Sequence, residues 1–335
     1  MTRGYLDNLL DMAPYKNADK QWYVELLRSD MYWYELIVNG YDNFDTRKSI
    51  MDSLKNLKSL IKNQLDKRFI YFIASRKRIR FANKKPRYSF IGNKLSLYIE
   101  EGKERKIRRI TTEIRDIQTG KPIKPKVETT DRFITFTDPN GNKRTWSIHD
   151  FLLNSNIPLG YGSEVHYVGY TKNPQERPID GSHSGLTDVL YRLADGDSDI
   201  FVYYNLFKVT TTAVSSKYNI NFHVSNAMID EIQVEKEGKI LEKCLILYFG
   251  AANQMRNREN EERELQNNLI QLANENKITA ITMHYEMEEP SEYFRFNSSS
   301  ISPKDRHLFT CTIKDDNLIF EEGSALYDAA FKKHA

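Results

Sequence analysis

The stretch EVHYVGYTKNPQER, residues 164–177, determines how the rest of the sequence is interpreted. Its β-branched and aromatic residues predict a strand that includes Tyr167. Gly169 allows another group to approach the backbone closely, and residues 171–174 predict a turn that enters a helix. Arg177 then falls in the first or second turn of that helix. The stretch therefore places a phenol and a guanidinium beside one end of a strand.

The sequence on the C-terminal side of this stretch alternates between strand and helix patterns. A second strand is predicted at DIFVYYNLFKV (199–209), and a long segment then ends in the apolar run KCLILYF (243–249). Together with the first strand, this alternation indicates an α/β unit of about 100 residues. A strongly charged helix and the strands KITAITMHYEM, HLFTCTIKD and NLIFEEG close the chain.

The N-terminal third is predicted to begin with two helices. Residues 21–41 are dense in apolar positions, which favours a buried helix, and Leu54 to Leu65 form an apolar stripe with lysines off it. From Arg76 to about Ile148 the pattern changes to strands. Turn sequences at 118–121 and 138–141 predict two hairpins there.

Positive charge is concentrated in one part of the chain. Residues 54–87 contain twelve Lys and Arg against the single acid Asp66, which leaves a net charge of −8 on the rest of a chain whose total is +3. Aromatic residues run through the block, so we interpret it as a folded basic face that binds nucleic acid. If residues 76–80 form one strand, Arg76, Arg78 and Arg80 share a face of it. The candidate phosphate-binding residues are Arg68, Arg76, Lys77, Arg78, Arg80, Lys84, Lys85 and Arg87.

Composition excludes several classes of protein. Apolar residues make up 40 % and charged residues 28 %, and no segment approaches the ~18 continuous apolar residues of a membrane span. Asp7 and Asp11 interrupt the N-terminal apolar stretch, so no secretory signal is expected. Cys244 and Cys311 cannot build a disulfide framework, and the closest histidines are 17 residues apart, so we expect a reducing cytoplasm and no structural zinc.

The central residues resemble the GIY-YIG nuclease family. In that family a YIG tripeptide is followed ten residues later by an arginine on the first helix, which is the spacing from Tyr167 to Arg177. A later helix bears a metal-binding glutamate, then come an apolar run and an asparagine, an order that Glu242 and Asn253 reproduce. The resemblance covers residues 146–257 and implies a small α/β nuclease domain.

One part of the family pattern has no match at the expected place. The first tripeptide should lie some ten to twelve residues before Tyr167, but Tyr161 is only six residues upstream. Either an insertion or bulge shifts the first strand, or the tyrosine usually assigned as general base is missing. After Arg177 the family often has a polar residue where this chain has Gly181, and His183 follows as a further acid or base candidate.

These residue types suit phosphodiester hydrolysis. A carboxylate such as Glu242 is the hard oxygen ligand that Mg²⁺ prefers, and Mg²⁺ or Mn²⁺ is the implied cofactor. A guanidinium such as Arg177 meets the charge on the phosphoryl oxygens with paired donors. Tyr167 is the candidate that orients or deprotonates the attacking water. With His183 and Asn253, these residues form the predicted catalytic set.

We therefore expect an α+β protein in three parts. Residues 1–145 form a basic helical and β-hairpin region that binds nucleic acid, 146–257 a GIY-YIG-like nuclease domain, and 258–335 a C-terminal helix with strands. The predicted activity is that of a cytoplasmic DNA endonuclease of the restriction, defence, repair or mobile-element type. A catalytically inactive DNA-binding or structural protein and an RNA-cleaving enzyme remain as alternatives, and a homodimer is left open.

Overall fold

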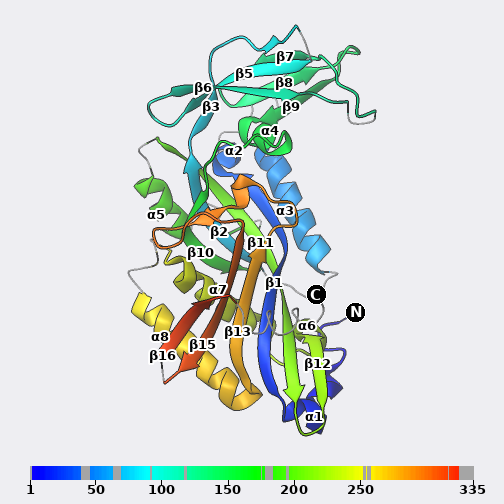
Figure 1. Cartoon of the computed structure of the whole chain (residues 1–335), viewed down its shortest axis with the longest axis vertical. Helices are drawn as coiled ribbons and strands as arrows, with labels where there is room; N and C mark the ends of the chain where they lie inside the picture. Colours follow the sequence, from blue (N-terminus) through cyan, green and yellow to red (C-terminus); the bar gives the residue numbers. More distant parts are fainter. Residues whose placement is uncertain are drawn as a thin grey trace.

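The computed structural model describes residues 2–38, 46–62, 69–90, 93–116, 119–174, 176–177, 184–193, 196–251, 254, 258–315 and 317–323. In this part the chain is an α+β protein built around a mixed sheet of nine strands (Figure 1). The order is β14 (Phe296–Asn297), β10 (Ser163–Thr171), β2 (Phe69–Lys77), β11 (Ser198–Ser215), β1 (Asp19–Trp33), β13 (Ile278–Glu286), β15 (Arg306–Lys314) and β16 (Asn317–Glu322), and β12 (Ile220–Ser225) pairs with β11. The strands predicted at 164–171, 199–209 and in the C-terminal region are confirmed.

Helices cover both faces of the sheet. On one face, Tyr71 of β2 belongs to an apolar cluster with α3 (Thr46–Lys62) and α5 (Ser184–Arg192). On the other face, Phe72 belongs to the main core with α7 (Val234–Phe249) and α8 (Arg258–Gln271). Because successive residues of a strand point to opposite faces, β2 is buried on both sides. The helices predicted around residues 54–65 and 256–276 are confirmed.

The helix predicted over residues 21–41 is wrong. Residues Asp19–Trp33 form the long strand β1, and only α2 (Tyr34–Val38) is helical in the described part of that segment. β1 pairs antiparallel with β11 from Asp19 to Trp33 and parallel with β13 from Lys20 to Glu25. In the N-terminal half of β1 buried and partly buried residues do alternate, with Trp22 and Val24 in the core. A register shift between Leu26 and Arg28 interrupts this alternation, so the sequence does not mark the whole segment as one strand.

A second unit is inserted between β2 and β10. Residues 78–162, which we call the inserted module, form two small sheets and a helix at the top of Figure 1. One sheet contains β3 (Ile79–Phe81), β5 (Lys94–Glu101), β4 (Arg87–Tyr88) and β6 (Lys106–Glu113); the other contains β7 (Lys126–Thr129), β8 (Phe133–Thr137) and β9 (Lys143–Ser147), followed by α4 (Ile148–Asn154). The predicted hairpin at 138–141 is confirmed as the turn between β8 and β9.

The nine-stranded sheet combines all three predicted regions. It takes β1 and β2 from the first region, β10 to β12 from the second and β13 to β16 from the third. The boundaries after residues 145 and 257 therefore do not separate independent sheets. Shorter elements complete the described chain: η1 (Asp7–Asp11), α1 (Ala13–Lys16), α6 (Asn226–Ile229), η3 (Leu272–Asn276) and η4 (Glu292–Phe294).

Candidate active site

Two tyrosines from neighbouring strands meet on the α3 and α5 face of the sheet. The rings of Tyr71 on β2 and Tyr167 on β10 are stacked, with centroids 5.9 Å apart and planes inclined by 20°. The antiparallel register places Tyr71 opposite Gly169. A Cβ atom on Gly169 would lie 2.3 Å from the Tyr71 ring. The close approach predicted at Gly169 is therefore confirmed, and the group that approaches is the phenol of Tyr71.

The variant Gly169→Ala tests this contact. The added methyl group must displace the Tyr71 ring, so we expect a loss of about 1 to 3 kcal/mol of stability and a lower rate at the site. Urea unfolding measures the first effect. In a Tyr71→Ala background the same change should cost less than about 0.5 kcal/mol, because the clashing ring is gone. An equal cost in both backgrounds would mean that the ring does not set the requirement for glycine.

A hydrogen-bonded turn brings Arg177 to the end of β10. The backbone N–H of Asn173 donates to Oγ1 of Thr171, and the N–H of Arg177 donates to the carbonyl of Asn173, each at 3.0 Å. The hydroxyl of Tyr204 donates to the carbonyls of Pro174 at 2.8 Å and Arg177 at 3.0 Å. Tyr204 on β11 thus fixes both ends of the segment that delivers the guanidinium.

Arg177 lies in this turn and not in the helix predicted to bear it. Among the described residues, the next helix, α5, begins at Ser184. Pro178 follows Arg177 in the sequence, and a residue before proline is disfavoured in the helical conformation. The Arg177 side chain is exposed, which leaves it accessible to a large anionic substrate.

Glu242 reaches the same strand from α7. Its Oε1 accepts a hydrogen bond from the backbone N–H of Tyr170 at 2.9 Å. This edge of β10 is available because β14 pairs only with Ser163 and Glu164. Gln254, just after α7, also binds the edge: Oε1 accepts from the N–H of Val168 at 2.9 Å and Nε2 donates to its carbonyl at 2.7 Å. The segment around α7 therefore closes the outer edge of the strand that bears Tyr167.

The four groups share one electrostatic environment. Burial raises the pKa of Glu242 to about 7, against the opposing effects of the Tyr170 N–H and Lys243. Burial also raises the pKa values of both Tyr71 and Tyr167. Glu242 raises these two pKa values further, whereas Arg177 lowers them. A side-chain hydrogen bond between the two phenols raises the pKa of Tyr71 and lowers that of Tyr167.

The structure thus brings together three predicted site residues, Tyr167, Arg177 and Glu242, and adds Tyr71. His183 and Asn253 lie outside the described residues. Tyr71 was missed because the inserted module separates two strands that pair with each other. Its sequence signal, an aromatic residue in the apolar strand FIYFIA, has meaning only if a long insertion before Tyr167 is allowed.

The predicted exposed face of Arg76, Arg78 and Arg80 is wrong. Arg76 is 4 % exposed, and its Nη2 lies 2.8 Å from Oε1 of Glu292. Arg80 is 8 % exposed, and its Nη1 lies 2.8 Å from Oδ1 of Asp199. The physical reason is that β2 occupies the middle of the sheet and ends at Lys77, so residues 76–80 do not form one exposed strand.

The remaining members of the predicted phosphate-binding set have different surroundings. Lys77 forms an ion pair with Asp197, and Nη1 of Arg78 donates to the carbonyl of Gly196. Lys84 lies over the ring of Tyr98. Lys85 and Arg87 are exposed, and Arg68 lies outside the described residues.

Comparisons with protein-family models, curated proteins and solved structures found no match. Among the residues that the structure describes, no group of three or more His, Cys, Asp or Glu side chains is arranged to hold a metal ion. No helix in the described ranges is long and apolar enough to cross a membrane.

Proposed function

We propose that the protein is a Mg²⁺- or Mn²⁺-dependent endonuclease that hydrolyses phosphodiester bonds in DNA. The supporting observation is that Tyr71, Tyr167 and Arg177 lie around the end of β10, while a desolvated Glu242 at the outer edge of the same strand acts electrostatically on both phenols. The resemblance to the GIY-YIG family points the same way. In this proposal Tyr71 supplies the first tyrosine of that pattern, and the inserted module lies between the two strands that would otherwise form a hairpin.

The residues present fit a divalent cation. Burial disfavours the ionised form of Glu242, so a nearby positive charge is what the carboxylate requires. Magnesium is commonly held by one or two carboxylates and completes its coordination with water and substrate phosphate. When bound, the cation polarises the phosphoryl oxygens and lowers the pKa of water. Glu242 is the residue that we expect to hold it.

The other three side chains act on the substrate and the water. Arg177 binds the phosphoryl oxygens and stabilises the negative charge that grows on them. The water oxygen attacks phosphorus, the bond from phosphorus to the leaving oxygen breaks, and solvent protonates the leaving group. Tyr167 orients this water through its hydroxyl, which stays protonated because burial raises the pKa of the phenol, and the proton of the water passes to solvent.

The charge of the inserted module favours a polyanionic substrate. Residues 78–162 contain 18 Lys and Arg against nine Asp and Glu, a net charge of +9 that leaves −6 on the rest of the chain. A domain with this charge attracts a polyanion. Lys84, Lys85 and Arg87 of the predicted phosphate-binding set belong to this module.

A cleavage assay with the full chain tests the proposal. Supercoiled plasmid, single-stranded DNA and total RNA are incubated with Mg²⁺ and, separately, with EDTA. We expect nicked or linear plasmid only in the presence of the metal. Cleavage that persists in EDTA, or an intact plasmid at every Mg²⁺ and Mn²⁺ concentration, would contradict it. Degradation of RNA alone would move the substrate from DNA to RNA.

The variant Arg177→Lys tests the role of the guanidinium. Lysine keeps the charge but lacks the planar pair of donors, so kcat should fall by about 100-fold with little change in DNA affinity. Arg263→Lys, an exposed arginine on α8, is the matched control and should cleave at the parental rate. A parental rate for Arg177→Lys would show that Arg177 contributes only surface charge.

A further inference from the structure

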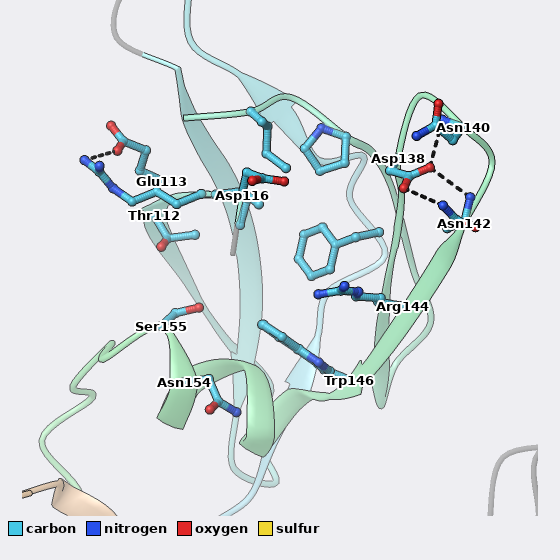
Figure 2. Close-up of a pocket in the computed structure, with 15 residues that line it drawn as sticks. Thr112, Glu113, Asp116, Asp138, Asn140, Asn142, Arg144, Trp146, Asn154 and Ser155 are labelled. Carbon is cyan, nitrogen blue, oxygen red and sulfur yellow. Dashed lines mark hydrogen bonds and ion pairs between the residues drawn. The ribbon is translucent and has the colours of Figure 1, made fainter. Parts of the chain in front are cut away.

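The inserted module contains a pocket of about 680 Å³ (Figure 2). It lies between the end of β6, the β8–β9 hairpin and the C-terminal end of α4. Part of its wall is aromatic: the rings of Phe136 and Trp146 pack edge to face with centroids 5.7 Å apart. Phe136 is buried and Trp146 is partly exposed, so the indole is the aromatic surface that a ligand can reach.

Polar side chains surround this aromatic surface. Figure 2 shows Arg144 and Trp146 projecting into the pocket from β9, with Asp116 on the side of β6. Asn140 and Asn154 add amide groups to the lining. Asp138 and Asp116 have structural roles. The carboxylate of Asp138 accepts hydrogen bonds from the backbone N–H groups of Asn140 and Asn142 at 2.8 and 2.9 Å, and Oδ1 of Asp116 accepts from the N–H and the hydroxyl of Thr119, each at 2.8 Å. The pocket therefore combines one stacking surface with several hydrogen-bonding groups.

The surroundings of the pocket restrict the ligand. A planar ligand with donors and acceptors at its edge suits an indole bordered by carboxylate, amide and guanidinium groups. The +9 charge of the module favours a ligand that is part of a polyanion. A nucleobase within a nucleic acid chain has both properties.

The pocket is separate from the candidate active site. Tyr71 lies near the start of β2, and the module begins beyond Lys77 at the end of that strand, about 20 Å away at ~3.3 Å per residue. A base held in the pocket is therefore not the nucleotide at the cleaved bond.

We propose that the pocket binds a single nucleobase that has swung out of duplex DNA, stacked on Trp146 and contacted at its edge by Arg144. This proposal rests on the proposed function in one respect, that DNA is the substrate. The new element is that the enzyme recognises an extruded base at a distance from the phosphodiester bond that it cleaves. Extrusion costs a few kcal/mol, least for a base that is already unpaired.

Binding measurements with two duplexes test the proposal. Fluorescence anisotropy compares a fully paired duplex with the same duplex in which one base faces an abasic site, using the Glu242→Gln variant so that no cleavage intervenes. The duplex with the unpaired base should bind about tenfold more tightly than the fully paired duplex, because no base pair has to be broken to extrude that base. Trp146→Ala and Arg144→Ala should each reduce that preference to about twofold or less, whereas Trp146→Phe should keep most of it. Lys121→Ala, an exposed residue outside the pocket, should weaken both duplexes equally.

Tryptophan emission gives a second readout. Trp22 and Trp33 are 1 % and 4 % exposed, so quenching on addition of the unpaired duplex reports Trp146, and it should disappear in Trp146→Phe. Equal affinity for the two duplexes, or a preference that survives Trp146→Ala, would overturn the proposal. So would quenching by free nucleoside monophosphates at concentrations where neither duplex quenches. A preference for the duplex with the unpaired base, without cleavage of plasmid, would contradict only the nuclease proposal. Cleavage of plasmid without that preference would contradict only the proposal that the pocket binds an extruded base.

Discussion

Replacement of Glu242 by glutamine is expected to reduce metal-dependent cleavage by at least about 1,000-fold and yet to make the protein more stable at pH 8. The amide keeps the shape of the side chain and can still accept the hydrogen bond from the Tyr170 N–H. It cannot supply the anionic oxygen that a divalent cation requires. DNA binding should hold or become tighter, because the repulsion between carboxylate and phosphate is removed.

The gain in stability follows from the pKa of Glu242. Burial raises this pKa from 4.5 to about 7, so the folded protein binds the proton more tightly than the unfolded chain. The contribution of the group to stability is fully present below about pH 4.5 and is lost as the pH rises through about 7. At pH 8 the parent protein holds a buried charge that Glu242→Gln lacks, a difference of up to about 3 kcal/mol. At pH 5 the difference should be much smaller.

Thermal melting with and without Mn²⁺ measures both effects. The metal should raise the melting temperature of the parent protein at pH 8 and leave that of Glu242→Gln unchanged. Glu235→Gln is the matched control, since Glu235 lies on the same helix but is exposed and paired with Lys172. Undiminished cleavage by Glu242→Gln, or an equal response of both proteins to Mn²⁺, would rule out Glu242 as the ligand.

Local patterns predicted much of the candidate site. The strand with Tyr167, the turn after it and the close approach at Gly169 follow from neighbouring residues, because glycine permits a close approach and proline restricts the backbone at its own position. The helix that bears Glu242 was implied by the resemblance and not by a local pattern, and it is present as α7. What these patterns could not show is which strand pairs with β10. The partner is β2, which precedes the whole inserted module, so Tyr71 was interpreted only as one of the aromatic residues of the folded basic face.

An irregular strand and buried charges explain the other failures. In β1 a register shift between Leu26 and Arg28 interrupts the alternation of apolar residues, so the segment resembled a buried helix. The net charge of residues 54–87 likewise does not show which of their charged side chains are exposed to solvent. Arg76 counts toward the basic block, but its guanidinium lies 3.9 Å from the centre of the Tyr293 ring and forms an ion pair with Glu292.

The variant Arg76→Ala is expected to destabilise the protein by about 3 to 5 kcal/mol, because it leaves a buried carboxylate without its cation. Both partners are shielded: the side chain of Arg76 is 3 % exposed and that of Glu292 is 6 % exposed. Nη1 of Arg76 also donates to the carbonyl of Glu292 at 2.6 Å, and Oε2 of Glu292 accepts from the N–H groups of Leu159 and Gly160 at 2.7 Å. Removing the arginine therefore disturbs the contacts among β2, the end of the inserted module and the segment before β14.

Urea unfolding of Arg76→Ala separates this structural role from phosphate binding. Arg87→Ala, an exposed arginine of the same basic block, should change stability by less than about 0.5 kcal/mol and reduce DNA affinity more strongly at low salt than at high salt. The double variant Arg76→Met with Glu292→Gln should recover much of the lost stability, because no unpaired charge remains buried and the amide oxygen can still accept from the N–H groups of Leu159 and Gly160. An Arg76→Ala protein with parental stability and weaker DNA binding would instead return Arg76 to the nucleic-acid-binding surface and show that the ion pair with Glu292 contributes nothing measurable to the fold.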